Sequence, residues 1–304
     1  PEAIRKAVDH HLTNAPDVLR ISRPDERPRY TTTHAQQLQR RTSQSIDKLN
    51  SSRVSPPSRR MVDAAIAHFS KPRDPTLEEL KYHVSQIVRA ASKRKTWRID
   101  RACIARRTQR TVSEKHAASI RDIARGRSRI ATLAELSPDD RYLVLACCRE
   151  AWQKAGYNVL GVSRSNVGAK RLYQETGIDA MSHKRLELMM HPTAKFQLKY
   201  HARQLWRAAR LKPTFALEPL KITKDTVLVV DDAESLSSQQ MATLTRDVAR
   251  QGGKLVLVRG SAGQRHGPSH TAFDSICRQL RQPQPHERPR QRPTRDQAID
   301  ELIN

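Results

Sequence analysis

Residues 133–145 read LAELSPDDRYLVL, and they join an apolar run, RIATLA at residues 129–134, to a helical pattern that continues to Ala155. The turn formers Ser137 and Pro138 lie between the two patterns, so this stretch predicts a strand, a short loop and a helix. That order is the layout of a phosphate-binding loop, whose pattern is G-x-x-x-x-G-K-[ST]. The four fixed positions of the pattern fall on Glu135, Asp140, Arg141 and Tyr142, and none of them matches.

The alternation of strands and helices continues beyond this stretch. Runs rich in Val and Leu predict three more strands, YNVLGVS at 157–163, TVLVVD at 226–231 and KLVLVR at 254–259. Helical patterns lie between the strands, at 141–156, 166–177 and 235–252. Near-continuous apolar strands separated by helices are typical of a parallel sheet covered on both faces. The predicted fold class is therefore α/β, in which ligands bind beyond the carboxyl ends of the strands.

The charge of the chain is strongly positive. Lys and Arg number 56 against 31 Asp and Glu, which gives a net charge of +25. Residues 89–129 carry 14 of these cations, three acids and one aromatic residue, Trp97, which favours phosphate contact over base stacking. A solvated charged face is the alternative. The predicted partner is DNA, single-stranded or duplex and without sequence preference, and the predicted contacts are Arg94, Arg98, Arg106, Arg107 and Arg110.

Composition divides the chain into four predicted parts. Residues 1–60 form a small, mainly helical N-terminal domain, and residues 61–128 form a basic helical segment. Residues 129–281 form the α/β domain, with a helical insertion near 181–226. Residues 282–304 have the Pro-, Gln- and Arg-rich composition of a disordered basic tail.

The cysteines and the apolar runs show which metal, disulfide and membrane features the sequence does not predict. Cys103, Cys147, Cys148 and Cys277 show no C-x-x-C spacing, so neither a zinc site nor a disulfide framework is predicted. No apolar stretch reaches the length of a membrane span and no signal segment begins the chain, so we expect a cytoplasmic protein without a membrane partner. The start at Pro1, without Met, indicates a piece of a longer protein.

The strand TVLVVD ends in two carboxylates, Asp231 and Asp232. P-loop ATPases keep a carboxylate at this place because it can hold the magnesium ion that is shared with the nucleotide. Asp is also a common loop opener, and Asp232 could cap the helix that follows. The order of strand, loop and helix before this segment favours the ATPase interpretation.

Three longer runs carry a resemblance to a known family: REAWQKAGYNVLGVSRSNVGAKRLYQETGI, TVLVVDDAESLSSQQMATL, and GGKLVLVRG through AFDSI. Together they resemble the RecD-like superfamily 1 helicase region of conjugative relaxases of the TraA/MobF kind. RPRYTTTHAQQLQR resembles the segment that precedes the ATPase core in those proteins. The resemblance covers most of residues 1–280, with the stretch near 93–128 as an insertion. It implies a RecA-like P-loop fold, ATP and magnesium as cofactors, and DNA and other conjugation proteins as partners.

The resemblance also assigns roles to single positions. Asp231 stands at the magnesium-binding acid, and Asp232 stands at the Glu that activates water, one methylene shorter. Arg259 and Gly260 stand where motif III has Gly-Asp, and Gly263 stands at its Gln, so this coupling element is altered.

Two further motifs follow from the same register. Ser163 and Ser165 stand at motif Ia, which touches single-stranded DNA, and loop capping is the equal alternative for both. Motif I falls on ELSPDDRY, so Asp140, Arg141 and Tyr142 are vestigial nucleotide-binding positions.

Several residues of that vestigial loop disfavour a working phosphate site. The loop lacks the glycines that let successive N–H groups face a phosphate, and Pro138 removes one donor. Arg141 keeps the positive charge of the usual Lys without its shape, and Tyr142 replaces the small hydroxyl that binds magnesium. We therefore expect no cofactor, with ATP and magnesium bound only if the site is functional.

Three functions remain open from the sequence. The first is a DNA-binding, helicase-like protein or fragment of a conjugative DNA-transfer system whose degenerate ATP site does not hydrolyse ATP. The second is an active ATP-dependent DNA helicase or ATPase module of a conjugative relaxase. The third is an interaction or assembly protein of a mobile element.

Overall fold

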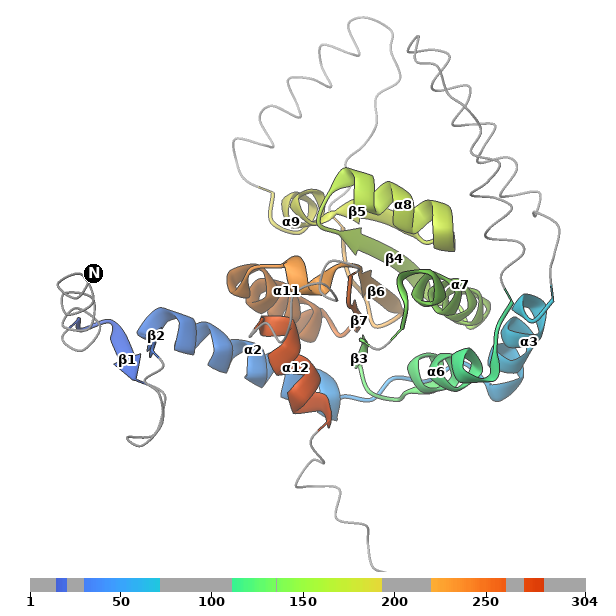
Figure 1. The fold of residues 1–304 in the computed structure, drawn as a ribbon, viewed down its shortest axis with the longest axis horizontal. Helices are drawn as coiled ribbons and strands as arrows, with labels where there is room; N and C mark the ends of the chain where they lie inside the picture. Colours follow the sequence, from blue (N-terminus) through green and yellow to red (C-terminus); the bar gives the residue numbers. More distant parts are fainter. Residues whose placement is uncertain are drawn as a thin grey trace, which may run out of the picture.

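The computed structural model describes residues 15–20, 30–71, 111–134, 136–192, 220–260 and 271–281, and its centre is a five-stranded sheet (Figure 1). The strand order is β3-β7-β6-β4-β5, and every pairing is parallel. The strands are β3 (Ile130–Leu133), β4 (Asn158–Ser163), β5 (Asp179–Ser182), β6 (Thr226–Val230) and β7 (Lys254–Val258). The predicted α/β class, a RecA-like P-loop fold with a parallel sheet covered by helices, is confirmed.

The two central strands bury every residue because helices cover both faces of the sheet. All five residues of β6 and all five of β7 are buried. Side chains of a strand alternate between its faces, and the core divides accordingly. Val227 and Val229 pack in one hydrophobic cluster, whereas Leu228 and Val230 pack in the other. The continuous Val and Leu run of β6 thus packs into both hydrophobic clusters, one on each face of the sheet.

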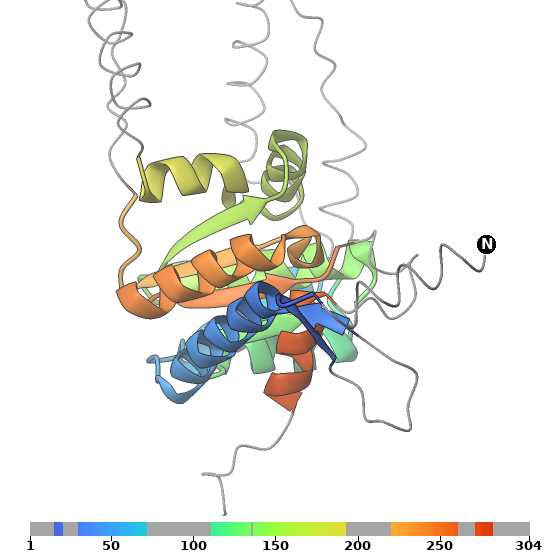
Figure 2. The ribbon, with the colours of Figure 1, turned by 90° about the vertical axis from the view of Figure 1, so that its left-hand side faces the viewer.

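Four of the described helices cover each face. The first face carries Val227 and Val229, and its helices are α3 (Arg59–Phe69), α6 (Glu114–Arg125), α7 (Pro138–Lys154) and α8 (Asn166–Thr176). The second face is covered by α2 (Thr33–Ser51), α9 (His183–Met190), α11 (Ser238–Gln251) and α12 (Ala272–Arg281). Figure 2 shows α2 and α11 lying side by side on this second face.

Strand β5 was not among the predicted strands. It is short, it pairs only with β4 at the edge of the sheet, and of its residues only Ser182 is buried. A short edge strand with mixed side chains has no strong period-two pattern. Helix α9 follows it directly and is the described beginning of the predicted insertion near 181–226.

The described helices of residues 1–128 lie on the α/β domain. Helix α2 packs on α11, and α3 and α6 pack on α7. Helix α3 crosses the predicted border between residues 60 and 61. A small antiparallel pair, β1 (Val18–Arg20) and β2 (Tyr30–Thr32), precedes α2, and Thr32 caps this helix by accepting a hydrogen bond from the Ala35 N–H at 3.1 Å. The predicted tail 282–304 lies outside the described residues.

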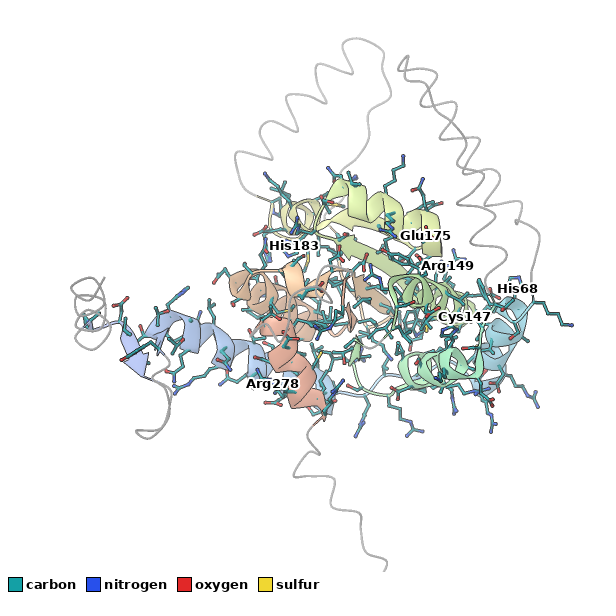
Figure 3. The ribbon with its side chains drawn as sticks, viewed as in Figure 1. His68, Cys147, Arg149, Glu175, His183 and Arg278 are labelled. Carbon is teal, nitrogen blue, oxygen red and sulfur yellow. The ribbon has the colours of Figure 1, made fainter. Side chains whose placement is uncertain are left out.

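Three cysteines, Cys147, Cys148 and Cys277, are free and buried, and Figure 3 labels Cys147 on α7. Burial raises the pKa of the Cys147 thiol to about 12, so it stays protonated at neutral pH. Within the described ranges, no helix has both the length and the apolar character that crossing a bilayer requires.

Candidate functional site

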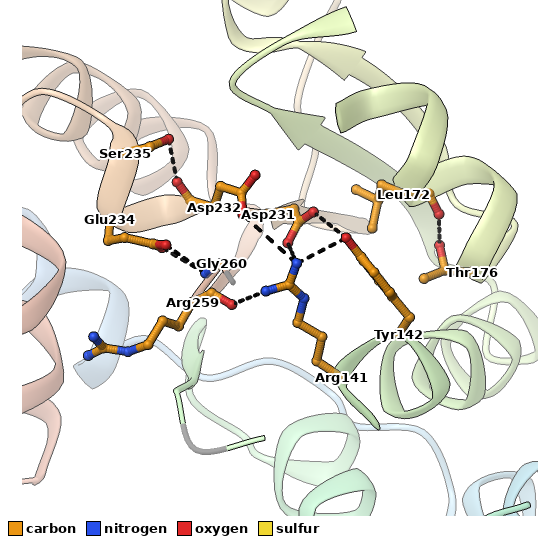
Figure 4. Close-up of polar contacts among 10 residues, drawn as sticks. All are labelled: Arg141, Tyr142, Leu172, Thr176, Asp231, Asp232, Glu234, Ser235, Arg259 and Gly260. Atoms are coloured by element: carbon orange, nitrogen blue, oxygen red, sulfur yellow. Dashed lines mark hydrogen bonds and ion pairs between the residues drawn. The ribbon is translucent and has the colours of Figure 1, made fainter. Parts of the chain in front are cut away.

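The candidate site lies where β3, β6 and β7 end, at the carboxyl edge of the sheet. Arg141 and Tyr142 lie in the first turns of α7, which follows β3, and Asp231 and Asp232 follow β6. Strand β7 pairs with both β3 and β6, so the two segments are separated by one strand. The structure therefore brings together the residues that the sequence assigned to motifs I and II (Figure 4).

Helix α7 begins earlier than a phosphate-binding loop would allow, at Pro138. Ser137 caps the helix, accepting a hydrogen bond from the Asp140 N–H at 3.2 Å and donating its hydroxyl to the Asp140 carboxylate at 2.7 Å. The other carboxylate oxygen of Asp140 lies 3.3 Å from His116 Nε2. Asp140 is thus bound within the protein, through both its amide and its carboxylate.

The Arg141 guanidinium is the centre of the site, and its side chain is only 3% exposed. One nitrogen, Nη1, donates to the backbone carbonyl of Arg259 at 2.7 Å. The other, Nη2, donates to the Tyr142 hydroxyl at 3.0 Å and lies 3.6 Å from Asp231 Oδ1 and 3.9 Å from Asp232 Oδ1. Burial alone lowers the pKa of Arg141, but Asp231 and Tyr142 outweigh it and the pKa is raised, so the cation is retained.

Asp231 and Tyr142 complete this buried network. The Tyr142 hydroxyl donates to Asp231 Oδ2 at 3.2 Å, and both side chains are almost completely buried. Burial raises the pKa of Asp231 to about 6, against the lowering effect of Arg141. Burial and the nearby Asp231 charge raise the pKa of Tyr142 to about 12, so its hydroxyl remains a neutral donor.

The turn after β6 is built by a second carboxylate contact. Asp232 adopts a left-handed conformation with φ of 55°, and the short helix η1 (Ala233–Ser235) follows it. Glu234 then accepts hydrogen bonds from the Gly260 N–H at 2.9 and 2.8 Å. A Cβ atom at Gly260 would lie 1.9 Å from Asp232 Oδ1 and 2.6 Å from Glu234 Oε1, so a larger residue would require these carboxylates to move.

Arg259, beside this glycine at the motif III position, has two separate roles. Its carbonyl accepts the hydrogen bond from Arg141, and its guanidinium lies 2.6 Å from the carboxylate of Asp274 on α12. The sequence did not indicate Glu234, Asp274 or His116 as part of the site. A contact between residues far apart in the chain leaves no local sequence signal. The only available signal was the acidic run DDAE at residues 231–234, which contains Glu234.

The two motif Ia serines lie after β4 in different settings. Ser163 is 1% exposed, and its hydroxyl has no hydrogen-bond partner among the described residues. Gly168 approaches it closely, since a Cβ there would lie 2.2 Å from Ser163 Oγ. Ser165 caps α8 by accepting a hydrogen bond from the Gly168 N–H at 3.0 Å. DNA contact by either serine stays a prediction.

The five arginines predicted to bind DNA lie outside the described residues. Within the described ranges, no group of three His, Cys, Asp or Glu side chains is placed to hold a metal ion. In the observed arrangement the buried cation of Arg141 faces two carboxylates, Asp231 and Asp232, and links α7 to the ends of β6 and β7.

Comparison with known proteins gives similarity to conjugal transfer proteins. The conjugal transfer protein TraA of Agrobacterium fabrum is 29% identical over 147 residues, which are 48% of this chain and 11% of the relative. TraA of Rhizobium radiobacter is 26% identical over 152 residues, 50% of this chain and 12% of the relative. The chain therefore spans only about an eighth or less of the length of these relatives. The similarity to TraA proteins agrees with the predicted resemblance, and the matched region covers about half of the chain, whereas the predicted extent was most of residues 1–280.

Among solved structures, the cytoplasmic domain of EssC aligns with 50% of this chain and 30% of its own length, at 14% identity and a TM-score of 0.29. The sequence model of a family described as "AAA domain" matches residues 143–296, which is half of the chain. The chain therefore belongs to the AAA domain family, as a RecD-like P-loop protein similar to the helicase region of TraA-type relaxases.

Proposed function

We propose that this chain binds DNA without sequence preference in a conjugal transfer system, and that it does not hydrolyse ATP. The similarity to TraA proteins and the net charge of +25 support the first part. The single observation that carries the second part is the Arg141 guanidinium, which lies between the start of α7 and the two carboxylates after β6. In a working P-loop site, magnesium and the phosphates of the nucleotide join these same elements.

Magnesium does not fit the residues present. It requires nearly octahedral oxygen coordination, whereas Asp231 is already bound by the Tyr142 hydroxyl and lies beside a buried guanidinium. A metal ion at Asp231 would compete with Arg141 for this carboxylate and leave the buried guanidinium with only the more distant Asp232. Removing one partner of a buried ion pair costs about 3 to 5 kcal/mol. The small hydroxyl that would ligate the ion is absent, because Tyr142 stands there.

The start of α7 is also poorly suited to bind a triphosphate. Anions bind helix N-termini through N–H groups that have no partner within the helix. Here Pro138 has no N–H, and the Asp140 N–H is taken by Ser137. The first turn also carries two acids, Asp139 and Asp140, whose charge repels phosphate. The family match begins at Leu143, just beyond the motif I positions.

The test measures ATP turnover, nucleotide affinity and DNA binding with the same preparation. We expect no magnesium-dependent turnover above background, with or without DNA, and no difference between the natural chain and Asp231→Ala. Hydrolysis that Asp231→Ala abolishes would overturn the proposal for ATP. For DNA, neutralising about six phosphates predicts a log–log salt slope near −5. Binding that ignores salt, or no binding at low salt, would overturn the proposal for DNA.

One observation favours the second candidate, an active ATPase module. Arg141, Asp231 and Asp232 lie together at the carboxyl edge of the sheet, and this proximity supports the ATPase candidate. Nucleotide-dependent shifts in melting temperature distinguish this candidate, because a nucleotide that binds the folded state raises the melting temperature. The third candidate, an assembly protein, would bind a protein partner with an affinity that persists in high salt.

A further inference from the structure

A groove lies between α2 and α11, on the face of the sheet shown in Figure 2. Its volume is about 400 Å³, and it is separate from the candidate nucleotide site, with no residue in common. The two helices pack directly on each other, and their apolar residues, such as Ile46 on α2 and Leu244 on α11, point into the core. The groove is therefore formed by the outer faces of both helices.

The charge of the groove is positive on both sides. Arg41 and Lys48 line it from α2, seven residues apart and hence on one helix face, and Arg246 and Arg250 line it from α11. All four side chains are exposed. No Asp or Glu contributes to the lining. These cations, of which Arg246 is paired with Asp247 outside the lining, give a local field that attracts an anion.

The two acids nearest in sequence lie outside the groove lining. Asp47, next to Lys48, accepts a hydrogen bond from the amide of Gln279 of α12 at 2.7 Å. Asp247 is buried and is shared between His191 at 2.6 Å and Arg246 at 3.2 Å. The other three cations, Arg41, Lys48 and Arg250, form no ion pair with any described residue. Their charge is thus available to a ligand.

The other lining residues indicate which kind of anion fits. Gln44, Gln239 and Thr243 add hydrogen-bond donors, and the lining contains no aromatic side chain on which a base could stack. Ala242 and Ala249 are small, so they leave room between the two basic rows. Phosphates, rather than bases, match this combination, and phosphate contacts carry no sequence information.

We propose that the groove between α2 and α11 binds the phosphate backbone of a DNA strand. The inference rests on the DNA binding proposed above and names a surface for it. Arg41, Lys48 and Arg250 are the principal phosphate contacts. Arg246, which shares Asp247, contributes less.

The test compares two triple variants that remove the same charge. The groove variant is Arg41→Gln, Lys48→Gln and Arg250→Gln. The control variant is Arg40→Gln, Lys184→Gln and Arg185→Gln, whose three positions are exposed and lie outside the groove lining. Binding to a labelled thymidine oligonucleotide of about 20 nucleotides is measured by fluorescence anisotropy across a salt series, with melting temperatures to confirm folding.

For the groove variant we expect about tenfold weaker binding at low salt and a salt slope smaller by about 2, since each phosphate contact to a single strand contributes about 0.7. The control variant keeps most of the slope. Equal losses in both variants mean that only net charge matters, and they overturn the inference. If the natural chain does not bind the oligonucleotide at all, the proposed DNA binding itself fails, whereas binding by all three proteins alike overturns only the groove.

Discussion

Arg141 Nη2 lies 3.6 Å from Asp231 Oδ1, and the two side chains are 3% and 1% exposed. A charge pair buried this deeply is weak evidence for net stability, because both ions lose their hydration. Both partners are nevertheless needed, since removal of either one leaves the other buried without its nearest opposite charge. The contact therefore holds the start of α7 against the end of β6.

Replacement of Arg141 by Met tests how much the Arg141–Asp231 pair contributes to stability. The variant leaves Asp231 buried beside Tyr142 without a cation, and we expect the free energy of unfolding to fall by about 3 to 5 kcal/mol. Urea denaturation measures it. In the double variant Arg141→Met, Asp231→Asn, the neutral amide still accepts from Tyr142, so much of the loss should return. A single variant within about 0.5 kcal/mol of the natural chain, the range of ordinary surface substitutions, would show that the pair is immaterial.

The pH dependence of stability should carry a signature of Asp231. Its pKa is about 6 in the folded chain and 3.8 ordinarily. Between these values the folded state binds more protons than the unfolded state, so stability falls as pH rises from about 4 to about 6. The contribution is on the order of 2 to 3 kcal/mol. Asp231→Asn should lack this fall, so the difference between the two unfolding curves across that pH range is the measurement. Parallel curves would contradict the raised pKa.

Substitution of Gly260 by Ala should disturb the turn after β6. The added Cβ would lie 1.9 Å from Asp232 Oδ1 and 2.6 Å from Glu234 Oε1, so the overpacked site should lose about 1 to 3 kcal/mol of unfolding free energy. The matched background is Asp232→Gly, which removes the nearest atom at a position with φ of 55° that glycine tolerates. In that background the same substitution should cost clearly less by thermal or urea unfolding. An identical cost in both backgrounds would place the strain elsewhere.

Replacement of Arg106, Arg107 and Arg110 by Gln should weaken DNA binding for all sequences alike, because phosphate contacts do not read bases. The salt slope should decrease by about 2 to 3. Anisotropy with several unrelated oligonucleotides measures both effects. A loss confined to one sequence would indicate base recognition instead.

Much of the fold could be predicted because its signals are local. The runs 226–231 and 254–259 are apolar from Val227 to Val230 and from Leu255 to Val258, a pattern of strands covered on both faces, and β6 and β7 are buried throughout. The helix predicted at 141–156 is present as α7, but it begins three residues earlier, at Pro138, where Ser137 caps it. Strand β5 was missed because a short edge strand lacks a distinctive pattern.

The sequence by itself determined four of the five strands of the sheet, the helices between them and the absence of glycine from the motif I loop, because each depends on neighbours along the chain. Only the tertiary structure decided that β7 lies between β3 and β6, and that the Arg141 guanidinium therefore meets Asp231. It also decided that α2 packs on α11, which places Arg41 and Arg250 along the same groove. Strand order and helix contacts are set by burial of apolar surface between distant segments, and that long-range packing leaves no periodic trace in the sequence.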